Sequence, residues 1–510
     1  MSMPGHAPLV PVPPTLLEPD LLAADPAGLA EVGRLVTELT REAAGALRRR
    51  TGPLPAVTPR ELTRLLDDEL PDGPLPATGG GRQAVLSLAR SYAAYTVDLA
   101  DPRAAAHLQP PALSVAAAAD VLASVFNASV DTWDSGPYAV EIERRLIRSL
   151  TDLAGYGPGA DGVLTPGGTA SNLQALLMAR DVALRAHRDI RGGGLTGLDA
   201  RPVVHCSELA HFSVARACAV LGLGEDAVRT VPVDDAHRMR PAELERALRL
   251  LAPNEVPIAV VATAGTTDYG SVDPLPELAA IAHRAGTRLH VDAAYGGGAL
   301  FSERLRPLLD GIEAADTITM DLHKTAWQPA AASVLLVRDA RDLAAATGLR
   351  VGYLNPDDDG AAGYDGLLGN SMATTRRADA FKVAATFLAL GREGVGAMLD
   401  ACHDLARDAA DAVEDHPRLE LTTRPTLTTV VFRYVPRAGG VSDAVNGALR
   451  RRLLAEGAAL IGRTDVADAE PGTGTVRLKL TLLNPQATAH DIAELLAAVD
   501  AAGQAVEAQL

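Results

Sequence analysis

From about residue 101 onward, short apolar runs alternate with longer segments whose apolar residues recur at helical spacing. After residues 167–172, for example, Leu173, Leu176 and Leu177 fall on one face of a helix. Apolar strands that alternate with amphipathic helices are typical of a parallel sheet covered on both faces. The pattern therefore predicts an α/β fold, with strands at 162–165, 202–205, 256–262, 288–291, 315–320 and 333–337.

The two ends of the chain follow other patterns. The first hundred residues read as helices broken by turns, with one apolar side along 29–50 and a Pro- and Gly-rich break at 71–81. The last part begins near residue 394 with an alanine-rich helix and continues with strands at 428–434 and 476–483. We therefore predict a helical N-terminal segment (1–104), a large domain (105–394) and a small α+β C-terminal domain (395–510).

Length and charge narrow the class of protein. A chain of 510 residues exceeds the size of one hydrophobic core, which agrees with several structural units. A net charge of -17, from 64 acidic and 47 basic side chains, argues against nucleic acid as a partner. The chain shows neither a basic, apolar leader nor a run of about 18 apolar residues, so we expect a cytoplasmic protein that does not enter a membrane.

The three cysteines have no disulfide framework and no spacing typical of metal ligands. Cys206, Cys218 and Cys402 cannot all pair with one another, and we expect free thiols and no metal site.

A glycine turn, Gly167-Gly-Thr-Ala-Ser-Asn172, is the first segment with chemical interest. Its glycines allow close backbone approach, its amides begin a helix, and Thr169 adds a hydroxyl, so the turn can bind an anion such as phosphate. Strand-turn-helix connections also use glycine and a polar residue for structural reasons alone. The turn therefore supports a phosphate site only when it is considered together with Asp292 and Lys324.

Asp292 and Lys324 each follow a predicted strand. Asp292 stands after the apolar residues 289–291, at the carboxyl end where open α/β sheets bind ligands, although an aspartate there can also simply form a turn. Lys324 follows the strand 315–320 and lies before Trp327, so we expect its amine at the same edge and partly shielded. Such an amine can lose its proton and act as a nucleophile.

These three groups match the needs of one cofactor. An amine, an anion-binding turn and a carboxylate that keeps a pyridine nitrogen protonated are what hold pyridoxal 5'-phosphate as an electron sink. His211 is a candidate to stack on the cofactor ring, but a lone histidine is more often a helix cap or a buried hydrogen-bonded group.

From about residue 80 to the C-terminus the chain resembles the group II pyridoxal-phosphate-dependent amino-acid decarboxylases. The resemblance is carried, in the family's order, by residues 162–180, His211, 262–267, 290–295 and 323–324. It implies fold type I with a mostly parallel seven-stranded sheet, and a homodimer with the active site at the subunit interface and an N-terminal segment that wraps the partner.

The resemblance also implies roles for individual residues. Lys324 would hold the cofactor covalently and Asp292 would contact the pyridine nitrogen. His211 and Ala294 would sandwich the ring, while Gly168, Thr169 and His323 would hold the phosphate, with Thr266 nearby. In the loop 356–365, Tyr364 occupies the place of the tyrosine that helps to protonate the carbanion left after carbon dioxide departs. Consecutive acids and glycines, however, are also typical of any solvated loop.

Within the family, the closest likeness is to the bacterial L-2,4-diaminobutyrate branch and to related lysine and ornithine decarboxylases. It is carried by residues 107–111, 127–134, 323–329, 353–356 and 374–377. Gln109, Ala326 and 136–138 depart from that branch near the expected substrate side chain. The candidate substrate contacts are Gln109, Pro111 and Trp133.

We predict decarboxylation of an L-amino acid, with a short diamino acid as first choice and lysine, ornithine or aromatic amino acids as alternatives. Transamination or oxygen-dependent aldehyde formation at the same site, and a catalytically inactive scaffold, are the rival hypotheses. Retention of a tyrosine at Tyr364 favours plain decarboxylation over aldehyde formation.

Overall fold

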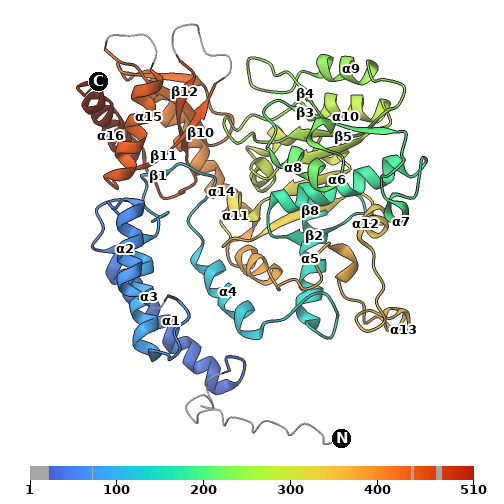
Figure 1. Ribbon diagram of the computed structural model, residues 1–510, viewed down its shortest axis with the longest axis horizontal. Coiled ribbons are helices and arrows are strands. Elements are labelled where there is room, and N and C mark those ends of the chain that lie inside the picture. The colour runs from blue at the N-terminus through green and yellow to red at the C-terminus, as the bar shows by residue number, and fades with distance from the viewer. Residues whose placement is uncertain (1–21, 72, 438–441, 467–473, 510) are drawn as a thin grey trace, which may run out of the picture.

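The computed structural model describes residues 22–71, 73–437, 442–466 and 474–509. Two sheets organise the chain, one in the large middle part and one in the C-terminal part (Figure 1). The three cysteines are buried free thiols, as predicted. Within the described ranges, no helix combines the length and apolarity needed to cross a membrane.

The large sheet has seven strands in the order β2-β8-β7-β6-β5-β3-β4. All run parallel except β8, which is antiparallel to both of its neighbours. The mostly parallel α/β fold is thereby confirmed. The strands are β2 (Asp161–Thr165), β3 (Arg201–Ser207), β4 (Val228–Val231), β5 (Glu255–Thr263), β6 (Arg288–Asp292), β7 (Thr317–Met320) and β8 (Ser333–Val337).

Helices cover both faces of this sheet. On one face α6 and α8 bury Leu176, Val214 and Ile258 in one core, and on the other face α5, α10 and α14 contribute to a second, larger core. The helices of this part are α4 (Ser114–Phe126), α5 (Pro137–Leu153), α6 (Gly168–Leu184), α7 (Ile190–Gly193), α8 (Ser213–Val220), α9 (Pro241–Arg249), α10 (Leu275–Arg284), α11 (Leu322–Thr325), α12 (Ala340–Thr347) and α13 (Asp357–Ala361).

The second sheet has five strands in the order β1-β11-β12-β10-β9. It is antiparallel except where β1 joins β11. The long helix α14 (Ala380–Glu414) leads into it and breaks at Gly391, whose φ of 68° is left-handed. The other elements are β1 (Ala104–Ala105), β9 (Leu419–Thr423), β10 (Thr429–Tyr434), β11 (Leu460–Asp465), β12 (Val476–Thr481), α15 (Asp443–Ala455) and α16 (Ala489–Glu507).

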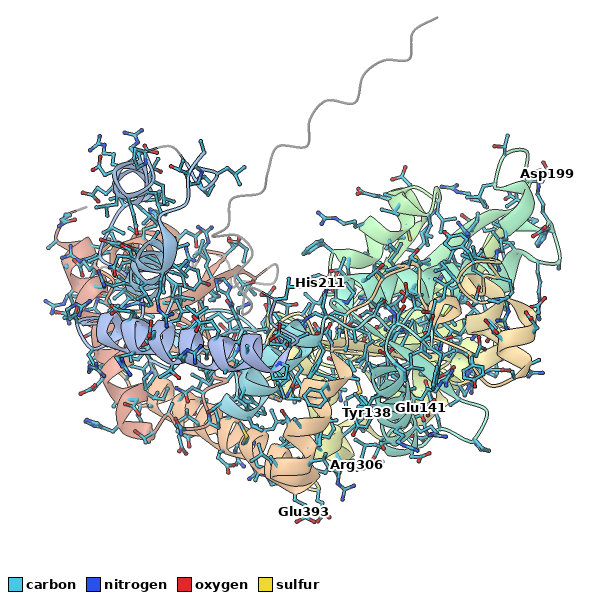
Figure 2. All side chains as sticks on the ribbon, turned by 90° about the horizontal axis from the view of Figure 1, so that it is seen from below. Tyr138, Glu141, Asp199, His211, Arg306 and Glu393 are labelled. Atoms are coloured by element: carbon cyan, nitrogen blue, oxygen red, sulfur yellow. The ribbon has the colours of Figure 1, made fainter. Side chains whose placement is uncertain are left out.

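Three N-terminal helices lie beside the C-terminal sheet and away from the large sheet (Figures 1 and 2). They are α1 (Pro26–Leu47), α2 (Pro59–Glu69) and α3 (Gly81–Tyr95), and ion pairs of Arg82 with Glu38 and of Arg90 with Glu42 join α3 to α1. The domain boundaries at 104/105 and 394/395 stay predictions.

Candidate active site

A cavity of about 240 Å³ opens at the carboxyl ends of β5, β6 and β7, next to the start of α6. Because these three strands are parallel neighbours, the residues that follow them meet at one edge of the sheet. The cavity brings together seven residues that the sequence pointed to: Gly168, Thr169, His211, Asp292, Ala294, His323 and Lys324.

A buried hydrogen-bond chain fixes the Asp292 carboxylate. Asn172 Nδ2 donates to Asp292 Oδ2 at 2.7 Å, and the backbone amide of Ala294 donates to Asp292 Oδ1 at 3.1 Å. Asn172 lies one helical turn after Gly168, so the same short segment supplies both the start of α6 and a partner for Asp292. The carboxylate is therefore held in one orientation at the cavity wall.

His290 continues this chain on the same face of β6, two residues before Asp292. Its Nε2 lies 2.9 Å from Asn172 Oδ1 and its Nδ1 lies 2.8 Å from the Thr317 hydroxyl. Burial lowers the pKa of His290 to about 4, although the neighbouring Asp292 carboxylate opposes that shift. The ring is therefore neutral near pH 7, with Nε2 donating to Asn172 and Nδ1 accepting from Thr317.

Lys324 lies on the one-turn helix α11 and pairs with Asp321. Its Nζ is 2.8 Å from Asp321 Oδ2, and the Lys324 side chain is 20% exposed whereas that of Asp321 is 4% exposed. Asp321 Oδ1 is buried and has no hydrogen-bond partner among the residues that the structure describes. The amine is thus held at the cavity by a carboxylate that can also share its proton.

The glycine turn forms another part of the cavity wall, close to Asp321. Gly167 precedes the first turn of α6 and has no side chain that could cap the helix, so the amides of that turn are open to an anion. A Cβ on Gly168 would stand only 3.1 Å from Ala294 Cβ and 3.3 Å from both carboxylate oxygens of Asp321. A side chain at this position would therefore crowd Ala294 and Asp321.

His211, which precedes α8, and His323, which lies beside Lys324 on α11, also line the cavity. His211 Nδ1 lies 2.8 Å from the Ser213 hydroxyl, and burial lowers the pKa of His211, partly offset by Asp292. Figure 2 shows His211 near the middle of the molecule. His323 Nδ1 lies 2.7 Å from the Ala332 carbonyl oxygen and so donates to it. Both rings are held by hydrogen bonds.

Other sequence-derived candidates lie elsewhere. Thr266 is buried and its hydroxyl lies 2.7 Å from that of Ser271, while the next residue, Thr267, lines the cavity instead. Tyr364 is 55% exposed and its ring packs edge-on against Trp133, with 5.1 Å between centroids. Gln109 is exposed and Pro111 half-buried, and it is Leu108, the residue before Gln109, that lines the cavity.

Sequence reasoning did not assign roles to Asn172, His290, Asp321 or Lys479. The i, i+2 alternation of a strand could have paired His290 with Asp292, and the i, i+3 spacing on α11 could have paired Asp321 with Lys324. Lys479 Nζ lies 3.2 Å from the carbonyl oxygen of the cavity residue Thr267, a contact across 212 positions that no local pattern reveals.

The cavity fits pyridoxal phosphate in its donor set. It presents an amine, a fixed carboxylate and an uncapped helix N-terminus, which are complementary to an aldehyde, a protonated pyridine nitrogen and a phosphate. The partnerless oxygen of Asp321 further marks the cavity as a place where a polar ligand is needed.

Comparison with known proteins also indicates an enzyme that uses pyridoxal phosphate. L-2,4-diaminobutyrate decarboxylase of Rhizobium meliloti (strain 1021) is 41% identical over 449 residues, covering 88% of this chain and 86% of the relative. The enzyme of that name from Acinetobacter baumannii is 36% identical over 440 residues, covering 84% and 85%.

A solved structure has a similar fold. The glutamate decarboxylase domain of diaminobutyrate-pyruvate transaminase and L-2,4-diaminobutyrate decarboxylase from Vibrio parahaemolyticus superposes with a TM-score of 0.83 and 28% identity, covering 95% of this chain and 98% of that one. The model of the pyridoxal-dependent decarboxylase conserved domain matches residues 59–435. The chain therefore belongs to the pyridoxal-dependent decarboxylase family, and it is a carboxy-lyase that uses pyridoxal phosphate.

Proposed function

We propose that this enzyme decarboxylates L-2,4-diaminobutyrate to the corresponding diamine and carbon dioxide. The observation that supports this choice of substrate is the 41% identity, across 88% of the chain, to a protein named for that activity. A lysine or ornithine decarboxylase is the second candidate, because the branch that the sequence resembles includes both.

The proposed roles of the residues follow from their positions. Lys324 binds the cofactor covalently, and Asp321 accepts or returns the proton of its amine at 2.8 Å. Asp292 holds the ring nitrogen, His211 and Ala294 cover the ring faces, and the start of α6 with Thr169 and His323 binds the phosphate. Bound pyridoxal phosphate supplies the electron sink for the electron pair left by carbon dioxide.

We further propose that Lys479 binds the substrate α-carboxylate. Two of the three donors of its ammonium group contact Thr267 O at 3.2 Å and Asp268 Oδ1 at 2.8 Å. The remaining donor is available to a carboxylate that enters beside Thr267, and the side chain is only 9% exposed, so the ion pair would be well shielded from water. This contact would also orient the bond that breaks.

A panel of amino acids tests the substrate. With the cofactor-loaded enzyme, we expect the highest kcat/KM for L-2,4-diaminobutyrate, with carbon dioxide and 1,3-diaminopropane formed in equal amounts. Mass spectrometry of the amine and coupled assays of carbon dioxide, ammonia and peroxide are the measurements. Release of ammonia and peroxide in step with carbon dioxide would contradict the proposal, as would a preference for aromatic or acidic amino acids.

The enzyme is proposed to act as a homodimer through an apolar face on α4, α5 and α14. Two adjoining hollows of about 390 and 640 Å³ lie there and share Ile142. Leu388 is 86% exposed and Tyr138 is 72% exposed on this face. Contiguous exposed apolar surface of this extent is typical of a face covered by a second copy.

The same face lies next to the candidate acid Tyr364. Trp133, on which Tyr364 packs, belongs to a small apolar cluster with Ala139 and Ala378, and both alanines also line the first hollow. Tyr364 is not among the residues that line the Lys324 cavity of its own chain. We propose that it serves the cavity of the second copy, which would make the dimer necessary for turnover.

Replacing Leu388 with aspartate tests the dimer. We expect a shift to monomer in sedimentation-velocity runs and a fall in turnover of at least about tenfold, because a charge on this face opposes apolar burial. Leu250→Asp, at a 70% exposed leucine after α9, is the matched control and should leave both unchanged. A dimer that persists in Leu388→Asp would refute this interface, and a fully active monomer would refute the role of Tyr364 in the second copy.

A further inference from the structure

The loop between β5 and α10 contributes Thr267 to the cavity lining, and Asp268 is the next residue of that loop. The loop is closed by its own hydrogen bonds: Gly270 N donates to Thr266 O at 2.8 Å and Gly265 N donates to Ser271 O at 2.9 Å. Tyr269 stacks on His237 behind it, with 3.7 Å between ring centroids. Asp268 is therefore held in place by a rigid turn.

Asp268 pairs with Lys479 across the two sheets of the molecule. Lys479 lies on β12 of the C-terminal sheet, and its Nζ is 2.8 Å from Asp268 Oδ1. The Lys479 side chain is 9% exposed, whereas that of Asp268 is 39% exposed. The positive partner is thus shielded, and the negative partner, one residue after the cavity residue Thr267, stays accessible.

The pair is unusual in this chain because lysine is rare. Only three lysines occur in 510 residues, namely Lys324, Lys382 and Lys479. Lys382 is 1% exposed and pairs with Asp120 and Asp379, and Lys324 lines the cavity. An ammonium at Lys479, rather than the guanidinium that the chain uses nearly everywhere else, gives one compact charge beside Asp268.

We propose that Asp268 selects the charge of the substrate side chain, binding its distal ammonium and repelling side-chain carboxylates. The proposal rests on the proposed function, in which Lys479 binds the α-carboxylate. A diamino acid carries one negative and one positive group besides the reacting amine, and the Lys479–Asp268 pair presents the two complementary charges 2.8 Å apart. An acidic side chain would meet the carboxylate of Asp268 instead, which like-charge repulsion disfavours.

The closeness of the two charges also bears on chain length. Because the ammonium and carboxylate of the pair are in direct contact, a substrate whose own carboxylate and distal ammonium lie close together matches them best. The short side chain of 2,4-diaminobutyrate meets this condition with fewer immobilised bonds than that of lysine.

The test compares Asp268→Asn with the parent enzyme, both loaded with cofactor. We expect kcat/KM for L-2,4-diaminobutyrate to fall at least about tenfold through KM. The value for L-2-aminobutyrate, which lacks the distal amine, should change less than about twofold. Titration calorimetry should show a similar loss of binding affinity for 1,3-diaminopropane but not for propylamine. Asp235→Asn, at a fully exposed acid of a neighbouring loop, removes the same charge and should change nothing.

Each other outcome is decisive. An equal fall in kcat/KM for all substrates would mean that Asp268 only positions Lys479. Unchanged kcat/KM values would mean that Asp268 takes no part in selection. Both results overturn the inference and leave the proposed function standing. A parent enzyme that prefers uncharged or acidic amino acids would overturn the proposed function itself, and this inference with it.

Discussion

Lys324→Ala should abolish turnover, with kcat reduced by at least about 10⁴-fold, because the amine is the group proposed to bind the cofactor covalently. The side chain is 20% exposed at the open cavity, and after its removal His323 Nε2, 3.5 Å from Asp321 Oδ2, still faces that carboxylate. The variant should therefore fold. Treatment with borohydride followed by denaturation should leave the cofactor attached to the parent enzyme and not to Lys324→Ala.

Peptide mapping makes this result unambiguous. With three lysines in the chain, the reduced cofactor can appear on only three lysine peptides besides the N-terminal amine, and we expect it on the one that contains Lys324. Attachment at Lys382 or Lys479, or a variant that turns over substrate at the parent rate, would contradict the assignment. Equal melting temperatures of the two cofactor-free proteins would show that the loss is chemical and not a failure to fold.

Asp292→Asn should lower kcat by about 10²- to 10³-fold while the cofactor stays covalently attached. The parent carboxylate accepts hydrogen bonds from Asn172 Nδ2 and from the Ala294 amide, whereas an asparagine amide nitrogen in either position would face another donor. The variant also removes the negative charge that keeps a pyridine nitrogen protonated. The electron sink is therefore weakened although the amine is untouched.

Asp316→Asn is the matched control for this second variant. Asp316 is a buried aspartate next to the opposite end of the same strand, where its Oδ2 accepts from Leu289 N at 2.8 Å. We expect it to lower the melting temperature but not the cofactor absorbance or kcat. Full activity in Asp292→Asn, or an equal loss of activity in Asp316→Asn, would refute the role given to Asp292.

Much of the fold was predictable because its strands are buried and apolar. The strand 333–337 was predicted at its observed bounds, and 288–291 fell one residue short of β6. The strand β4 was missed: it is four residues long, lies at the edge of the sheet, and carries Arg229 and Thr230 between its two valines. Edge strands of this kind lack the continuous apolar run that identifies buried ones.

The site was predictable where a residue directly follows a strand, and not where a contact joins distant segments. Asp292 and Lys324 line the cavity as expected from their strands. Thr266 was named where Thr267 lines the cavity, because which way each residue of a tight turn points depends on hydrogen bonds such as that of Thr266 to Ser271. Lys479 reaches the site from the C-terminal sheet, and strand alternation alone does not tell which loop it meets.

The scarcity and shielding of lysine have a practical consequence for anyone who labels this enzyme. Surface cations are arginines, while the lysines at positions 382 and 479 are 1% and 9% exposed. Acylating dyes and amine-directed cross-linkers will therefore find almost no side chains to react with on the native fold except the amine at position 324. The extent of such modification in the cofactor-free protein should report on the number of open catalytic centres, and attachment to solid supports will require carboxylate chemistry instead, because the three cysteines are buried.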